Sequence, residues 1–490
     1  MKKLFKTVAV IAALTGGASI AGAWFTGQQV EGVAQSIVDI TNENLKPLRE
    51  GLDIQGRIVL LSVESRTFSS TVRYRIIPKD EQSPTGAAPA DFILVDEIEH
   101  GPFPWTRLKN LNLMPVMATS RYSLEKTPST EPFFAATQDQ SPLQAHIIHG
   151  YTGASSGQVT VLPMDVTLEH EVIKTSGLSV EFEETQGGNK LRVKSQIKDF
   201  KILPVDQQAS KLGVQLKAFE LDYDLIKSAD DLYAGKRVVT LGEGILNWQD
   251  PQTTVGIKGL ELNSVSELNG HLLKSQEAYR VSAISLNGKS IASVDMNLAA
   301  RDINIPAFLS VLSALETVGK STQVGAAQPL EMSHLYELKK ASEDYMESKP
   351  YVELDKLTIK TASGESSFSL AFGLNKPSGL ARSEADQIRH MIASLYVDLK
   401  LSKPMLADLL SAQAQLAGTT DPADIPHLAK MSSEWIGLKA VQTGLATVKD
   451  DTIRASLVYS AGQVDLNDQK MTVEEFLNLL LTLSGQLTPH

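Results

Sequence analysis

Residues 178–197 read LSVEFEETQGGNKLRVKSQI, with two alternating apolar and polar stretches on either side of a glycine-rich turn. Apolar residues at every second position indicate a strand that buries one face, and Gly187-Gly188-Asn189 is typical of a tight turn. The stretch therefore predicts an antiparallel hairpin, in which the acidic side chains of the first strand face the basic side chains of the second.

The same alternation recurs along much of the chain, at Val72–Ile76, Phe219–Leu225, Val294–Leu298, Phe368–Leu374 and Val397–Leu401. Strands with one apolar and one polar face are typical of antiparallel sheets. The sequence therefore predicts an α+β fold that is predominantly antiparallel β, with an elongated curved sheet that could form a groove. We expect helices to be concentrated in the C-terminal third, together with one N-terminal transmembrane helix.

Helical periodicity is found mainly after Pro306. It predicts helices over residues 330–348, 383–393, 404–416 and 422–448, the last of them interrupted near Gly437 and Gly444. Near the C-terminus, Thr472 is followed three residues later by Glu475, which is the spacing of a capping box. This pair predicts the start of an amphipathic helix.

The N-terminus carries the strongest localisation signal. The first thirty residues contain three charged side chains, all of them basic: Lys2, Lys3 and Lys6. The apolar stretch from Val8 to Phe25 is about as long as a membrane-spanning helix, and basic residues stay on the cytoplasmic side. Trp24 and Phe25 fall where an aromatic belt would meet the outer interface. We therefore expect a single-pass anchor in the inner membrane, with the bulk of the chain in the periplasm.

A cleaved signal peptide is the alternative to an anchor. Ala21-Gly22-Ala23 fits the small-residue pattern of a cleavage site, and cleavage would leave a soluble periplasmic protein. The anchor is favoured because the apolar stretch is longer than a usual signal core. Either segment would direct the rest of the chain out of the cytoplasm.

Charge and cysteine content exclude several kinds of protein. The net charge is −11 although the N-terminus is basic, so the body of the chain is acidic and would repel nucleic acid. The chain has no cysteine, which excludes disulfides, cysteine-based zinc sites, iron–sulfur clusters and a lipidated cysteine. We expect no cofactor.

These signals together divide the chain into five regions. We predict a membrane anchor or signal segment over 1–27, a juxtamembrane linker or helix over 28–50, a β-rich periplasmic region over 51–305, a mixed region with several helices over 306–450, and a C-terminal hairpin with an amphipathic helix over 451–490.

Motifs that resemble catalytic or ligand sites lack the context that such sites need. Gly153–Gly157 matches the nucleophile pattern G-x-S-x-G, but strand-like residues follow it where a helix is required. His146 and His149 would point to opposite faces of a strand, which disfavours a shared metal. Gly319-Lys320-Ser321 and Gly288-Lys289-Ser290 lack the earlier glycine of a phosphate-binding loop and are predicted as ordinary loops. We therefore predict no catalytic, cofactor-binding or metal-binding residue, and no enzyme activity.

The most unusual stretch is HGPFPW, residues 100–105. Two prolines on either side of Phe103 restrict the backbone to an extended loop. One interpretation is a binding loop or partner contact. The favoured interpretation is a rigid crossover that closes one edge of the sheet.

Three segments of the chain match a known family: Gly22-Ala23-Trp24 and two family-motif segments. The residues of the two family-motif segments are His100, Gly101, Pro102, Phe103, Pro104, Asn467, Gln469, Lys470 and Met471. On these residues, and on similar strand patterns between them, the chain resembles the YdgA-like family of Gram-negative envelope proteins. The resemblance implies an inner-membrane anchor, a periplasmic body and a domain of unknown function, and it supplies no catalytic residue.

Three functional hypotheses follow. The leading one is a non-enzymatic envelope protein, tethered to the inner membrane, that binds or carries lipid on an apolar sheet face. The second is a structural or interaction scaffold of an envelope complex, contacting a protein through its acidic surface or the Pro102–Pro104 loop. The least favoured is a hydrolase with an unrecognised site.

Overall fold

The computed structural model describes residues 30–44, 56–78, 91–168, 171–185, 188–205, 212–228, 232–249, 252–322, 332–376, 383–418, 421 and 423–487. The predicted anchor, residues 1–27, lies outside these ranges. In the described part of the chain, no helix combines the length and the apolar character needed to cross a membrane. The chain divides into two units: unit 1 runs to Lys227 and includes Lys236–Gly256, and unit 2 comprises Ser228–Gly235 and Ile257 onward.

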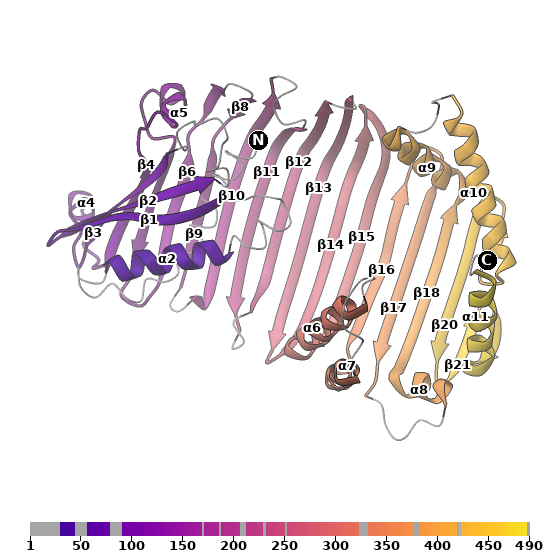
Figure 1. Cartoon of the computed structure of the whole chain (residues 1–490). Coiled ribbons are helices and arrows are strands. Elements are labelled where there is room, and N and C mark those ends of the chain that lie inside the picture. The colour runs from indigo at the N-terminus through magenta and orange to yellow at the C-terminus, as the bar shows by residue number, and fades with distance from the viewer. Residues whose placement is uncertain are drawn as a thin grey trace. The chain divides into compact units, whose positions relative to one another are not determined.

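Unit 1 is mainly β structure (Figure 1). Its helices are α2 (Val30–Asn44), α4 (Trp105–Lys109) and α5 (Glu131–Ala136). Its strands are β1 (Gly56–Ser65), β2 (Ser69–Pro78), β3 (Phe92–His100), β4 (Ala118–Leu124), β5 (Leu143–His149), β6 (Ser155–Val161), β7 (Met164–Thr167), β8 (Glu171–Thr175), β9 (Leu178–Glu184), β10 (Lys190–Pro204) and β11 (Leu212–Lys227). Strands β12 (Tyr233–Gln249) and β13 (Gln252–Asn269) contribute residues to both units.

Antiparallel pairing connects the strands of unit 1 in the order β1–β2–β3–β4–β5–β6–β9–β10–β11. The β7–β8 hairpin lies against the end of β10. The predicted hairpin is β9–β10, and its register places Glu183 opposite Arg192, with 3.5 Å between carboxylate and guanidinium. The prediction of a predominantly antiparallel β fold is thus confirmed in this unit.

Helix α2 covers one face of the sheet in unit 1. Val30, Ala34 and Val38 recur every four residues and are buried in the core of the unit, which also includes Ile58 and Tyr74. Such spacing places three side chains on one stripe of a helix. The same helix protects strand β1, because the Asn42 side chain accepts a hydrogen bond from Ile58 N and donates one to Ile58 O, each at 2.9 Å. These bonds satisfy backbone groups that an edge strand would otherwise expose.

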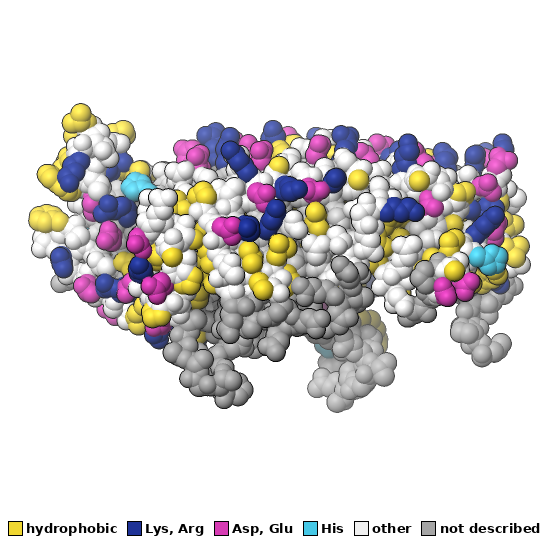
Figure 2. All heavy atoms as spheres, turned by 90° about the horizontal axis from the view of Figure 1, so that it is seen from above, with side chains coloured by type: hydrophobic (Ala, Val, Ile, Leu, Met, Phe, Trp, Pro, Cys, Tyr) yellow, Lys and Arg dark blue, Asp and Glu magenta, His cyan; other side chains and the backbone are white. Residues whose placement is uncertain are grey.

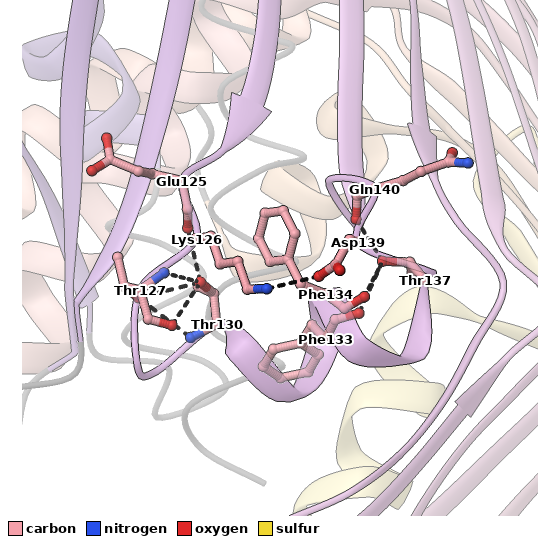
Figure 3. A network of polar contacts seen from close by, with 9 residues as sticks. All are labelled: Glu125, Lys126, Thr127, Thr130, Phe133, Phe134, Thr137, Asp139 and Gln140. Atoms are coloured by element: carbon pink, nitrogen blue, oxygen red, sulfur yellow. Dashed lines mark hydrogen bonds and ion pairs between the residues drawn. The ribbon is translucent and has the colours of Figure 1, made fainter.

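The connection between β4 and β5 adds two aromatic side chains to this core (Figure 3). Thr130 is fully buried, and its hydroxyl donates to Glu125 O and accepts from Thr127 N, both at 2.8 Å. Lys126 and Asp139 close the connection with an ion pair of 2.7 Å. These contacts hold α5 so that Phe133 and Phe134 point into the core.

Unit 2 combines long strands with most of the larger helices. Its strands are β14 (Leu272–Leu286), β15 (Lys289–Asn304), β16 (Tyr351–Lys360), β17 (Glu365–Leu374), β18 (Ile392–Ser402), β19 (Thr447–Lys449), β20 (Thr452–Ser460), β21 (Gln463–Leu466) and β22 (Gln469–Thr472). Its helices are α6 (Ile305–Thr322), α7 (Met332–Met346), α8 (Glu384–Met391), α9 (Lys403–Ala417), α10 (Ile425–Gln442) and α11 (Val473–Leu487). Successive antiparallel pairs link β14, β15, β16, β17, β18 and β20.

The predicted late helices correspond to α7, α8, α9 and α10. Helix α10 is not interrupted at Gly437, so that detail of the prediction was wrong. A Cβ atom at Gly437 would lie 3.3 Å from the side chain of Lys403, so the glycine allows close packing there rather than ending the helix. The helix ends before Gly444, which has a positive φ of 69°.

Helix α6 was not predicted. Pro306 occupies its first turn, and the Asn304 side chain accepts a hydrogen bond from Ala307 N at 3.1 Å, as an N-terminal cap does. As a result Gly319-Lys320-Ser321 belongs to this helix, so its prediction as a loop was wrong. Gly288-Lys289-Ser290, in contrast, begins at the turn between β14 and β15, where Gly288 has a φ of 78°.

The capping box before α11 is present as predicted. Thr472 N donates to Glu475 Oε2 at 2.7 Å, and Glu475 N donates to Thr472 Oγ1 at 3.2 Å. Each side chain therefore satisfies a backbone donor of the other residue.

We predict that Thr472→Ala will destabilise the first turn of α11 by about 1 kcal/mol, because a backbone donor loses its partner. Hydrogen–deuterium exchange of the α11 amides should accelerate accordingly. Thr482→Ala, which removes a hydroxyl bonded to the Asn478 carbonyl inside the same helix, is the matched control. Equal acceleration in both variants would show that the cap is not the cause.

Candidate functional site

The strands of unit 2 place their apolar side chains in continuous rows, because residues paired across an antiparallel ladder point to the same face. One row crosses five strands and consists of Leu298, Leu354, Leu370, Val397 and Leu457. A second row consists of Tyr279, Met296, Leu357, Phe368 and Leu399. We call these two rows the apolar face.

The apolar face is only half-buried. Every residue in its two rows has intermediate exposure, and β16 contains no buried residue at all. Helices α8 and α11 form a core cluster at one corner, where Ala385, Val464 and Val473 are buried with Tyr459. In Figure 1, α6 and α7 lie near one end of the strands and α9 near the other. The middle of the rows therefore keeps apolar surface in contact with solvent.

The other face of the same strands is polar. Asp295 pairs with Arg280 at 3.0 Å, and Lys400 pairs with Asp398 at 3.2 Å. Figure 2 shows charged side chains of both signs along one margin of the part that holds unit 2. The residues of the two rows are uncharged. At the β14 end, Glu277 lies opposite Leu298 on the same face and accepts a hydrogen bond from the phenol of Tyr279. Across β15, β16, β17 and β18 the rows present only apolar side chains.

The first family-motif segment forms the start of the connection between β3 and β4. Gly101 N donates to Met117 O at 2.7 Å, and Val116 N donates to Pro102 O at 3.0 Å, so the two ends of this loop are held together. The Gly101–Pro102 peptide is cis. A Cβ atom at Gly101 would lie 1.9 Å from Val116 O, so this backbone contact excludes any other residue.

This loop does not cross the sheet, so the prediction of a crossover was wrong. Strands β3 and β4 pair directly with each other, and the loop is the connection of a hairpin. His100 contacts Ser70, with 3.0 Å between Nε2 and Oγ, while Phe103 is exposed. The prolines therefore restrict a loop that projects from the end of the hairpin, and this loop does not close an edge of the sheet.

The second family-motif segment forms the turn between β21 and β22. Asn467 has a positive φ of 54°, its Oδ1 accepts from Ser456 N at 2.9 Å, and its Nδ2 donates to Leu445 O at 3.1 Å. Met471 packs against the corner cluster, while Gln469 and Lys470 are exposed. The segment thus joins three backbone stretches of unit 2, and no geometry brings its residues together as a reactive site.

The histidines and serine of the rejected motifs lie on adjacent strands. His149 and Ser155 are buried, with Nδ1 and Oγ 3.2 Å apart, and burial lowers the pKa of His149 to about 4. His146 lies on the opposite face of β5, opposite Arg121, as its spacing predicted. Strand β6 runs from Ser155 to Val161, so the strand predicted after Gly157 is confirmed and begins within the motif, and no helix follows the serine as a nucleophile elbow requires. Within the described ranges, no group of three histidine or acidic side chains could hold a metal ion.

A buried carboxylate in unit 1 was missed by the sequence reasoning. Asp96 is 1% exposed, and its Oδ2 accepts a hydrogen bond from Ser120 at 3.3 Å. Within the described residues its Oδ1 has no hydrogen-bond partner. Burial raises the pKa of Asp96 to about 7, although hydrogen bonds from Tyr122 and Ser120 oppose the shift. The alternation of Leu94, Asp96 and Ile98 already placed this residue on the apolar side of β3, and that signal could have identified it.

Comparison with known proteins places the chain among proteins without an assigned function. A family model described as "Bacterial protein of unknown function (DUF945)" matches residues 1–474. Protein YdgA of Escherichia coli (strain K12) is 24% identical over 494 residues, which cover 98% of this chain and 97% of that protein. Uncharacterized protein YihF of the same organism is 20% identical over 488 residues, covering 96% of this chain and 97% of that protein. No solved structure matches. The resemblance to the YdgA-like family is thereby confirmed.

We predict that Asp96→Asn will stabilise unit 1 at alkaline pH. The folded pKa of about 7 lies above the ordinary value of 3.8, so the folded state binds the extra proton and loses stability as pH rises from about 4 to 7. At pH 8 the variant should be more stable by on the order of 2–4 kcal/mol, and at pH 4 the difference should vanish.

Hydrogen–deuterium exchange of the β3 and β4 amides, compared at equal pH, measures this difference. Asp165→Asn removes an exposed carboxylate paired with Lys174 and serves as the control. A variant that is less protected than the wild type at pH 8 would contradict the assignment of Asp96 as a neutral buried acid.

Proposed function

The chain belongs to the DUF945 family of bacterial proteins of unknown function, and we propose that it is a non-enzymatic lipid-binding protein of the cell envelope. The apolar face of unit 2 would hold the acyl chains. The single observation that carries this proposal is the pair of half-buried apolar rows across β14, β15, β16, β17, β18 and β20. An apolar surface of this extent in a soluble body indicates a binding surface.

The chemistry of the rows favours a hydrocarbon over an extended polypeptide. An extended peptide laid across the face would bring polar backbone groups, and those groups need partners once they leave water. The backbone groups of β15, β16, β17 and β18 are already paired with neighbouring strands. An acyl chain has no such requirement, so it can lie across the rows without unsatisfied polar groups.

The width of a row also matches the length of an acyl chain. Five neighbouring strands span four spacings of about 4.8 Å, which gives about 19 Å across a row. One leaflet of a bilayer has a hydrocarbon depth of about 15 Å, so an acyl chain matches the width of the row.

The proposed location is the periplasmic side of the inner membrane. The basic residues Lys2, Lys3 and Lys6 before an apolar stretch that ends at Trp24 and Phe25 support a single-pass anchor there. A tether at a bilayer would keep the lipid-binding surface close to its source of lipid.

A scaffold function is the second candidate, and helix α10 supports it. Leu428, Met431, Trp435 and Leu438 are 46–59% exposed and follow the three- and four-residue spacing of a coiled-coil seam. The opposite side of the helix is buried, at Ile425, Ala429 and Ser433 among other residues. This stripe would fit a helix of a protein partner.

Site-specific photocross-linking in cells tests lipid binding on the intact chain. With Leu370 replaced by p-benzoylphenylalanine, illumination should join the protein to phospholipid labelled with radioactive phosphate. Ser367 is the matched control, because it lies three residues away on the opposite face of the same strand, opposite Lys400. Label on the Leu370 probe and not on the Ser367 probe is the expected result.

A charge in the same row, opposite Leu370 on the adjacent strand, should weaken the signal strongly. Val397→Asp, combined with the probe at Leu370, should lower the yield of lipid adduct tenfold or more. About 1.4 kcal/mol corresponds to tenfold, and burial of a carboxylate in hydrocarbon costs more than that. Ser367→Asp, which places the new carboxylate beside Lys400, should leave the yield unchanged. Adducts with protein alone would refute the lipid proposal and favour the scaffold.

A further inference from the structure

Three connections of unit 1 emerge at the same end of its sheet. They are residues 66–68 between β1 and β2, residues 101–117 between β3 and β4, and residues 150–154 between β5 and β6. His100 N donates to Phe68 O at 2.9 Å, and Met117 N donates to His149 O at 2.8 Å. These bonds join the three connections at their bases.

Large apolar side chains project from all three connections. Each is between 51% and 86% exposed, and the set consists of Phe68, Phe103, Trp105, Leu111, Leu113, Met114 and Tyr151. We call this set the apolar tip. Figure 2 shows hydrophobic side chains with charged side chains of both signs near them at the left end, where α4 lies in Figure 1.

Hydrogen bonds fix the backbone of the loop between β3 and β4, which carries most of the apolar tip. Arg107 donates from Nη2 to Asn112 Oδ1 at 2.7 Å and to Met114 O at 3.3 Å. Glu99 accepts from both the backbone N and the hydroxyl of Thr106, at 2.9 and 2.7 Å. These bonds fix the loop in a conformation that leaves its apolar side chains exposed.

The charge of the three connections themselves is opposite to that of the whole chain. The three connections contain three basic residues, Arg66, Arg107 and Lys109, and no acidic one, whereas the whole chain carries −11. Lys109 Nζ lies 5.4 Å from the centre of the Trp105 ring. Aromatic and aliphatic side chains beside lysine and arginine suit the boundary between acyl chains and anionic headgroups.

We propose that the apolar tip inserts into the surface of an anionic phospholipid bilayer. Phe103, Trp105 and Leu113 enter the boundary between headgroups and acyl chains, and Arg66 and Lys109 contact lipid phosphates. This contact uses unit 1 alone, so it does not depend on lipid binding by unit 2.

A fluorescent probe at the apolar tip tests the insertion. The natural chain has no cysteine, so Leu113→Cys in the full chain can be labelled at one position with an NBD fluorophore. In vesicles of phosphatidylethanolamine and phosphatidylglycerol, doxyl-labelled lipid should reduce the NBD emission about twofold. Gln144→Cys, an exposed position near the start of β5 and away from the tip, provides the control and should not be quenched.

Charge reversal tests whether the quenching depends on the attraction between the basic residues of the tip and anionic lipid. Arg66→Glu with Lys109→Glu should remove most of the quenching at Leu113→Cys, and vesicles of phosphatidylcholine alone should give little quenching without any substitution. Equal quenching in neutral and anionic vesicles would overturn the electrostatic part of the proposal. No quenching at Leu113→Cys or at a second label, Leu111→Cys, would overturn insertion.

Discussion

Backbone pairing between antiparallel strands holds the middle of unit 2 together, and little side-chain packing supports it. The pairs from β14 to β20 are continuous, yet no residue of β16 is buried. A sheet in a globular domain normally gains stability by burying one face against a second layer. Within the described residues, the buried cluster that α8 and α11 form covers one corner of unit 2, and the apolar rows across β16 stay half-buried. The proposed function rests on these half-buried rows of leucine, valine and phenylalanine.

In unit 1, helices and loops of the same unit cover one face of the sheet. Helix α2 and the phenylalanines of α5 pack onto its sheet and make a core that includes Ile58, Tyr74 and Leu94. Asn42 satisfies the outer backbone groups of Ile58. A polar group that this core tolerates poorly is the carboxylate of Asp96, because burial disfavours its charged form. The described residues of unit 1 thus cover much of their own sheet, and large apolar side chains stay exposed in the loops at one end of it.

Local patterns in the sequence were enough to predict much of this fold. Alternation over residues 178–197 predicted the β9–β10 hairpin and its charge pairing, because both depend on neighbours in the chain. The Thr472–Glu475 capping box has the same local origin. Helix α6 was not predicted because its start depends on the Asn304 cap. Helices were predicted from apolar periodicity, and this cap is not part of that pattern.

Features that depend on tertiary context could not be predicted in the same way. Whether helices cover the apolar rows depends on where α6 and α9 pack, and amphipathic helices can pack on many surfaces. The connection at His100 was mistaken for a crossover because a rigid proline loop looks the same in sequence whether its two strands pair or not.

The roles of the two family-motif segments also depend on tertiary contacts. Gly101 and Asn467 secure backbone turns, through a close contact with Val116 O and through hydrogen bonds to Ser456 and Leu445. A resemblance that rests on such residues identifies the fold. Function must then be argued from other surfaces of the protein, which these residues stabilise but do not form.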